Sequence, residues 1–581
     1  MAGETIDIEQ IVEPEVLAVE IANRWREWDT LRNKKIEEWK ELRNYLYATD
    51  TKTTGNAMLP WSNTTTTPKL TQLMDNLHAN YFASLFPQQK WLKFEADSLD
   101  SNVKAKRDTI QAYMENKIKQ SDFVNVASDL IYDYIQYGNC FATVAWEDRY
   151  KIKEDGDYIS QYVGPRVVRV SPFDICFNPA ASDFLKSPKI IKTIKTLGEI
   201  KRMIKDDPAN ESMQPILDKM LHARASVRGS DATFNKSEGY VADGFSSIQH
   251  YYESDYVEIL TFYGDIFDYQ NDELQVDRVI TIVDRAYILT NEENPSWLGH
   301  APIFHAGWRP RPDNLYAMGP LDNLVGMQYR IDHLENLKAD VFDQIAYPIM
   351  KIRGDVEDFD FEPGTRIYLG EEGDVGYLVP DTTALNADLQ IQNLENKMEE
   401  MAGAPRQAMG IRTPGEKTAF EVQSLQNASS RIFEHKTAHF ERVFLEPILN
   451  SMLETARRYM NFSDTIRVID DATGVAFFRD ITKDDIISSG KIVPVGARHF
   501  AERARRVQSL TQLFQIKASD PSVAAHLSGK EFARIISEEL GEKSLFGENI
   551  AIAEQLETQT QMQNAEVVNQ EGLMQQEEMG I

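Results

Sequence analysis

The feature that most constrains the fold is a pair of helical segments on either side of a short, turn-rich insert. Residues 321–346 and 383–402 place apolar side chains at intervals of three and four, whereas residues 347–382 alternate short apolar runs with Gly, Pro and acidic residues. The first pattern indicates helices with one apolar stripe, and the second indicates short strands. Each helix would extend about 30 to 40 Å. The sequence therefore predicts a long helical hairpin joined through a small β-rich module.

Each helix of the predicted hairpin has only one stripe to bury. The first stripe consists of Leu324, Met327, Ile331, Leu334, Val341 and Ile345, with Lys338 as its only charged member, and the second of Ala384, Ala387, Ile391, Leu394, Met398 and Met401. The remaining faces are charged and must meet water or another subunit. Two arrangements stay open: lateral packing of copies in a ring, and a solvent-exposed hairpin on a monomer.

A loop rich in glycine and proline follows at residues 403–417, and a helix of about forty residues begins at 418 and runs through Pro447. Proline removes one backbone hydrogen bond and clashes with the preceding turn, so we expect a kink just before Pro447. Glycines let a loop change conformation between rigid helices. The expected hinge residues are Gly403, Pro405, Gly410, Pro414 and Gly415.

Composition limits the partners and the compartment. The chain has 581 residues and a net charge of −29, so its average surface repels nucleic acid and any DNA contact would be local. Cys140 and Cys176 lie in apolar runs and are expected to be reduced core residues. No run approaches the roughly eighteen apolar residues of a membrane span, and the N-terminus has no signal-peptide pattern. A reducing, cytosol-like compartment without membrane contact is expected.

The rest of the chain reads as a mixed α+β region followed by a helical end. Helices are expected at 13–48, 68–85, 101–120 and 122–137, strands from 138 onward, and a helical break near 196–224. Residues 498–581 begin with helical patterns and end in a tail rich in Gln and Glu. Two readings of that tail stay open: a helical barrel extension, and disorder.

This order of segments resembles the portal proteins, or head-to-tail connectors, of tailed bacteriophages, above all those of short-tailed phages. The resemblance covers roughly residues 15 to 545. The local features that carry it are WREWDTLRNKKIEEWKELRNYLY, PKLTQLMDNLHANYFASLFP, VRVSPFDICFNPAA and GPLDNLVGMQYRIDHLENLKADVFDQIAYP. They are patterns of order and composition rather than a catalytic signature.

The resemblance implies a non-enzymatic fold of the α+β class with a wing, a helical stem hairpin, a small clip, a long kinked helix and a helical crown. Its parts would be the wing at 1–320, the stem at 321–346 and 383–402, the clip at 347–382, the tunnel loop at 403–417, the long kinked helix with wing strands at 418–497, and the crown at 498–581.

The resemblance also implies an assembly. Twelve copies would form a ring at one capsid vertex of the virion, assembled in the host cytoplasm, around the channel through which viral DNA is packaged and ejected. The implied partners are double-stranded DNA without sequence preference, the major capsid protein, the terminase large subunit and then a tail adaptor protein. No cofactor is implied.

Two groups of residues are candidate contacts under this reading. Arg406, Arg412 and Lys417 in the tunnel loop are candidates for weak contacts with sliding DNA, because cations repeated around a ring would bracket the duplex without reading bases. Pairing with acidic residues of neighbouring copies is the open alternative. In the clip, Glu371, Glu372 and Asp374 are candidate docking charges for the motor and the adaptor; an ordinary solvated acidic surface is the alternative.

Two other classes of function remain as rivals. Residues 410–418 (GIRTPGEKT) lie one inserted Glu416 away from a phosphate-binding loop, which would suggest a nucleotide-binding enzyme. That loop needs a preceding buried strand, whereas a Glu-rich helix is expected here, and Glu416 would repel phosphate. His435 and His439 have the spacing of metal ligands but lack the catalytic glutamate, so no metal or catalytic residue is assigned. A capsid scaffold or head-completion protein without a channel is the third class.

Overall fold

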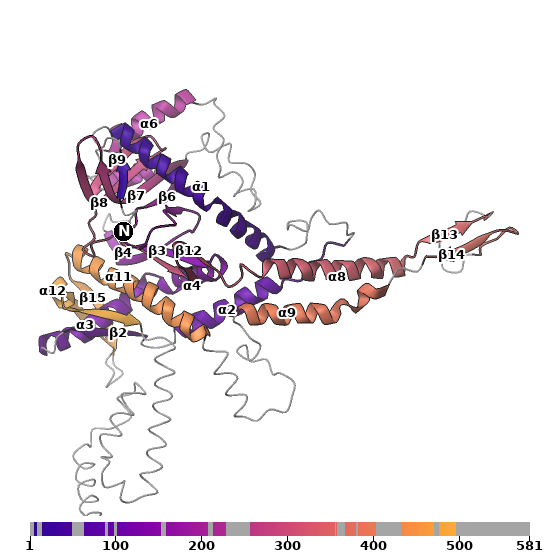
Figure 1. Ribbon diagram of the computed structural model, residues 1–581. Coiled ribbons are helices and arrows are strands. Elements are labelled where there is room, and N and C mark those ends of the chain that lie inside the picture. Colours follow the sequence, from indigo (N-terminus) through magenta and orange to yellow (C-terminus); the bar gives the residue numbers. More distant parts are fainter. Residues whose placement is uncertain are drawn as a thin grey trace, which may run out of the picture. The chain divides into compact units, whose positions relative to one another are not determined.

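The computed structural model describes residues 5–8, 14–48, 63–86, 91–97, 101–152, 158–206, 213–227, 256–354, 356, 366–378, 382–402, 432–469 and 476–494. Two compact units are present. The first comprises described residues of Met1–Phe82, Asn125–Val144 and Val167–Phe444, and the second those of Ala83–Val124, Ala145–Arg166 and Leu445–Ile581. The chain is a mixture of helices and strands, which confirms the predicted α+β class (Figure 1).

The first unit contains a six-stranded sheet with the order β5-β6-β7-β8-β9, and β1 also pairs with β7. Only the pairing of β1 with β7 is parallel; the others in this sheet are antiparallel. Its strands are β1 (Thr5–Ile8), β5 (Ile175–Phe177), β6 (Lys189–Thr196), β7 (Tyr256–Asp268), β8 (Glu273–Val283) and β9 (Tyr287–Glu293). The helices α5 (Leu197–Asp206) and α6 (Gln214–Val227) follow β6, at the predicted helical break.

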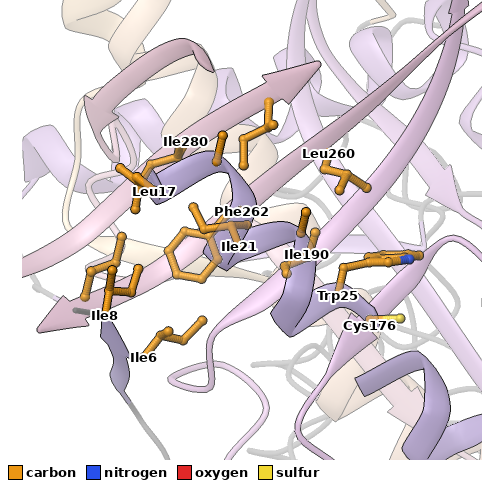
Figure 2. Packing of buried hydrophobic residues seen from close by; sticks show 14 of the residues in the cluster. Ile6, Ile8, Leu17, Ile21, Trp25, Cys176, Ile190, Leu260, Phe262 and Ile280 are labelled. Atoms are coloured by element: carbon orange, nitrogen blue, oxygen red, sulfur yellow. The ribbon is translucent and has the colours of Figure 1, made fainter. Parts of the chain in front are cut away.

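The long N-terminal helix α1 (Pro14–Leu46) forms where the aromatic amphipathic pattern predicts it. Figure 2 shows Leu17, Ile21 and Trp25 of this helix beside Ile6 and Ile8 of β1 and side chains of the sheet strands. Strand β1 alternates exposed and buried residues, so both of its isoleucines join this core. Cys176 is buried in the same cluster as a free thiol, as predicted.

Arg32 fixes α1 to the chain around β5. Its guanidinium is buried and donates to the backbone carbonyls of Pro172 at 2.8 Å, Phe173 at 2.7 Å and Ile175 at 2.6 Å. Asp29 supplies the opposite charge at 2.9 Å. Three carbonyls and one carboxylate use most of the five donors of the guanidinium, so this buried cation is satisfied.

A second core of the first unit surrounds Trp39, which packs edge-on against Tyr137, Phe173 and Tyr316. Strand β10 (Ile303–Gly307) pairs antiparallel with the start of β3 (Asn139–Ile152), which carries the second buried free cysteine, Cys140. Further elements that lie mainly in the first unit are α2 (Lys69–Leu85), α4 (Phe123–Gln136) and the hairpin of β11 (Arg309–Arg311) and β12 (Asn314–Met318). Strand β4 (Tyr158–Val170) follows β3 in the sheet order β10-β3-β4; it begins in the second unit and ends in the first.

The second unit combines helices with two small antiparallel sheets. Its elements are α3 (Ser101–Gln120), α11 (Glu446–Tyr459), α12 (Lys483–Ile486), the pair β2 (Leu92–Ala96) and β17 (Gly490–Pro494), and the pair β15 (Asp464–Ile469) and β16 (Ala476–Ile481). Asn450 of α11 donates to the carbonyl of Ile492 at 2.9 Å and accepts its N–H at 2.8 Å, which joins that helix to β17.

The predicted helical hairpin is present in the first unit. Helix α8 (Val325–Ala346) is followed by β13 (Met350–Arg353), β14 (Asp374–Tyr377), the short 3₁₀ helix η5 (Thr382–Ala387) and α9 (Asp388–Ala402). Figure 1 shows α8 and α9 side by side, with β13 and β14 continuing beyond the end of α8. Both predicted helices and the predicted short strands between them are therefore confirmed.

Candidate functional site

The face of α8 toward the rest of the first unit carries three buried polar residues, Gln328, Asp332 and Asn336. A spacing of four residues places them in one row along the helix. An extended segment, residues 63–68, lies against this row and is called the strap here. Polar side chains are buried at this face because the strap offers them backbone groups to bond.

Gln328, Asp332 and Asn336 form hydrogen bonds mainly with backbone groups of the strap. Asn336 accepts the N–H of Thr65 at 2.9 Å and donates to its carbonyl at 2.7 Å. Asp332 accepts the N–H of Thr67 and the hydroxyl of Thr66, both at 3.1 Å. Gln328 donates to the carbonyl of Thr67 at 2.5 Å and accepts the N–H of Leu70, the second residue of α2, at 3.2 Å. Burial raises the pKa of Asp332, and these hydrogen bonds oppose that rise.

Ion pairs tie the same region to α9. Lys69, at the start of α2, bonds Glu399 at 2.7 Å, and both side chains are buried. Lys338 of α8 pairs with Asp388 at the start of α9. The apolar residues Ile331 and Ile391 are buried on the two helices. The proximal half of the hairpin, nearest the strap, is therefore held by both polar and apolar contacts.

The distal half of the hairpin is exposed. Of the predicted stripe of α8, Leu324, Ile331 and Leu334 are buried, but Ile345 is 43% exposed, so a single copy covers only the first part of the stripe. Beyond it Tyr347 is 80% exposed. The large apolar side chains exposed between the end of α8 and the start of α9 are Phe342, Ile345, Tyr347, Ile349, Ile352, Ile367, Tyr368, Leu369, Tyr377, Leu378 and Leu389.

The β13–β14 hairpin is amphipathic. Met350 lies opposite Tyr377 and Ile352 opposite Val375, and directly opposed residues of an antiparallel pair share one face. Ile352 is 56% exposed and Tyr377 is 54% exposed, so this apolar face is uncovered in a single copy. A two-stranded hairpin is marginal on its own in water. We call Met350, Ile352, Val375 and Tyr377 the apolar clip face.

The other face of β13–β14 is polar, and the predicted docking charges lie at its end. Asp374 is opposite Arg353 in the ladder, and Glu371 and Glu372 form the turn before β14; all three acids are exposed. Gly354 has a φ of +79°, and a Cβ there would lie 2.3 Å from the carbonyl oxygen of Glu372, so the turn requires glycine. A docking role for these acids stays a prediction.

The predicted tunnel loop lies outside the described residues, as does the crown. This applies to the loop cations Arg406, Arg412 and Lys417, to the hinge residues Gly403, Pro405, Gly410, Pro414 and Gly415, and to the phosphate-loop-like residues 410–418. The segment before them is α9, a helix as predicted, rather than the strand that a phosphate-binding loop requires.

The described part of the long helix resumes at residue 432. A π-helical turn, η6 (Glu441–Leu445), follows residues 432–440 and leads into α11, whose first turn contains Pro447. The chain is helical without a break from residue 432 through Pro447, and prolines and π-helical turns are the usual places where helices kink. The kink itself stays a prediction.

No protein-family model matches this chain, and neither does any curated protein. Within the described residues, no helix combines the length and apolar character needed to cross a bilayer. The described residues also contain no group of three or more His, Cys, Asp or Glu side chains able to hold a metal ion.

Proposed function

We propose that this chain is a portal subunit of a tailed-phage virion, twelve copies of which form a ring at one capsid vertex around the channel for viral DNA. In this proposal the α8–α9 hairpin is the stem, and the β13–β14 module is the clip that docks the terminase large subunit and then the tail adaptor. Residues 1–320 would form the wing that meets the major capsid protein. The chain performs no catalysis in this role.

The observation that carries the proposal is the change of burial along the α8–α9 hairpin. Its proximal half is packed and hydrogen-bonded within one copy, whereas the described residues of its distal half expose many large apolar side chains, including an apolar clip face. Soluble monomers rarely expose large contiguous apolar patches, and such patches mark interaction sites. Lateral packing of identical hairpins would bury these side chains without any other partner.

The strap supports the same reading. By bonding Gln328, Asp332 and Asn336, it braces the base of α8 inside each copy, so the hairpin has a fixed orientation before any neighbour arrives. A braced hairpin loses less conformational entropy when it packs against another copy. A ring of such hairpins would enclose a channel wall of long helices.

The test is the oligomeric state of the purified full-length protein. Negative-stain electron microscopy is expected to show rings with a central hole in end view, and light scattering coupled to size-exclusion chromatography is expected to give a mass near twelve copies. Compact monomers at micromolar concentration would contradict the proposal.

The rival, a capsid scaffold without a channel, fits the exposed apolar face as well, since any homo-oligomer would cover it. The scaffold and the portal differ in the shape of the assembly. A scaffold gives sheets, shells or closed clusters, whereas the portal reading requires a closed ring with an open axis wide enough for a DNA duplex.

A further inference from the structure

Five basic side chains of the first unit lie near one another, at Trp308 and where the described part of the long helix begins. Arg309 comes directly after Trp308 and is the first residue of β11. The other four, His435, Lys436, His439 and Arg442, belong to the helical residues 432–445. We call these five residues the cationic patch. His435, His439 and Arg442 are spaced by four and three residues, so they occupy one side of successive turns. Arg309, His435 and Arg442 are exposed.

Trp308 holds two of these cations in place. The ammonium of Lys436 donates to the carbonyl of Trp308 and lies 4.5 Å from the centroid of its indole ring, while the guanidinium of Arg309 lies 5.2 Å from the same ring. The indole N–H donates to the hydroxyl of Tyr81 at 3.0 Å, which fixes the ring. These partners are neutral, so they orient the two cations without cancelling their charge.

The charges of the cationic patch act on one another. Burial and then the neighbouring Arg309 lower the pKa of Lys436. Burial followed by Lys436, Arg442 and His435 lowers the pKa of His439. Carboxylates are not among the causes of either shift, and none of the five forms an ion pair with a described residue, although Glu434 and Glu441 lie on the same stretch of chain. In a chain of net charge −29, the five residues form a local cluster of basic side chains.

We propose that the cationic patch contacts the phosphate backbone of duplex DNA. This inference rests on the proposed function, which brings DNA to the ring. Arginine, lysine and protonated histidine bind phosphates without reading bases. The helical stretch from His435 to Arg442 spans about 10 Å at about 1.5 Å per residue. A DNA duplex carries one phosphate charge per about 1.7 Å of its axis, so this length faces several phosphates. The lowered pKa of His439 favours its neutral form, which limits the charge that this row of residues presents to a moving duplex.

The experiment measures binding of a short linear duplex to purified full-length rings at several salt concentrations. The variant combines Arg309→Gln, His435→Gln and Arg442→Gln, which removes the three exposed members. It is expected to bind the duplex about tenfold more weakly near 50 mM salt and to give a shallower dependence of log K on log salt, since each lost phosphate contact removes about 0.9 from the slope.

The matched control combines Lys201→Gln, Lys205→Gln and Lys219→Gln, three exposed lysines of α5 and α6 in the same unit. It removes three formal positive charges against two in the patch variant, with histidine counted as neutral, so unchanged binding there assigns the loss to the patch. An equal loss in both variants would reduce the effect to net charge and overturn the inference.

Three further outcomes separate this inference from the proposed function. If wild-type rings form but the patch variant binds DNA with an unchanged slope of log K against log salt, the inference is wrong, whereas the proposed function is not contradicted. If the patch variant alone fails to form rings, the cations pair with acidic groups of a neighbouring copy, which also overturns the DNA contact. Absence of rings in the wild-type protein would instead contradict the proposed function.

Discussion

Lys69 and Glu399 form the buried ion pair that joins the start of α2 to α9, at 2.7 Å. Removing one partner of such a pair leaves the other charge without compensation. We predict that Glu399→Gln lowers the free energy of unfolding by about 3 kcal/mol, because the buried ammonium of Lys69 then has only neutral acceptors, such as the side chain of Gln72, and no opposite charge. The measurement is denaturant unfolding at fixed protein concentration.

The control for this pair is the double change of Lys69→Met with Glu399→Leu. Replacing a whole buried pair by apolar side chains is often neutral or stabilising, so the double variant should recover most of the loss. A double variant as unstable as Glu399→Gln would show that packing at Glu399, and not the charge of Lys69, carries the effect.

Lys189 makes stability depend on pH. Burial lowers its pKa from 10.5 to about 7, and its ammonium has the carbonyls of Phe184 and Leu185 as hydrogen-bond acceptors. Between about pH 7 and pH 10.5 the unfolded chain therefore binds a proton that the folded chain does not. We predict that the wild type gains stability relative to Lys189→Met as pH rises through this window, by up to about 1.4 kcal/mol per pH unit.

Unfolding free energies of both proteins at pH 7.5 and 9.5 check this sign. Lys201→Met is the control, because Lys201 is exposed; its difference from the wild type should stay constant with pH. A constant difference for Lys189→Met as well would mean that Lys189 titrates alike in the folded and unfolded chains.

The strap is held against α8 by hydrogen bonds between side chains of α8 and the backbone of the strap. Asn336→Leu leaves the N–H and the carbonyl of Thr65 without their side-chain partner, and an intramolecular hydrogen bond contributes about 0.5 to 1.5 kcal/mol. We predict faster amide hydrogen exchange at Thr65 and Thr67, while amides of the β7–β8 pair keep their protection. Arg330→Leu, on an exposed position of α8, should leave the strap amides unchanged.

This element also marks the limit of prediction from the sequence. The three-four spacing of apolar residues predicted α8 and α9 correctly, because that period is local to each helix. The row of Gln328, Asp332 and Asn336 has an equally regular spacing of four, but it reads as a solvated face until the strap, more than 260 residues earlier in the chain, is known to cover it. Long-range backbone partners leave no periodic signal in the sequence.

Among the candidate site residues, the sequence placed the clip acids on a turn, but it did not find the cationic patch. Trp308 and Arg309 lie far in sequence from Lys436, and only the fold brings them together. The sequence also could not show that the distal part of the apolar stripe of α8 is exposed. Apolar spacing predicts that a helix face is covered, but it does not say whether the same copy of the chain or a neighbouring copy covers it. Ile345 is the clearest example.

For the whole molecule, the apolar clip face should control association. We predict that Ile352→Ser combined with Tyr377→Ser shifts the protein from rings toward monomers, with unfolding of the monomer unchanged, because both side chains are exposed within one copy. Light scattering and circular dichroism report the two properties. Leu274→Ser with Val276→Ser, on exposed positions of β8, is the matched control and should still form rings.

Charge opposes that association, because every copy carries −29. The Debye length falls from about 10 Å at 0.1 M salt to about 3 Å at 1 M, so salt screens the repulsion between copies but leaves apolar contacts intact. We predict that raising NaCl from about 0.1 M to about 0.5 M increases the ring fraction at fixed protein concentration, whereas binding of duplex DNA to preformed rings falls over the same range. Sedimentation velocity and a duplex-binding titration measure the two quantities on one preparation. Rings that dissociate as salt rises would show instead that ion pairs between copies, rather than the exposed apolar hairpin, hold the assembly together.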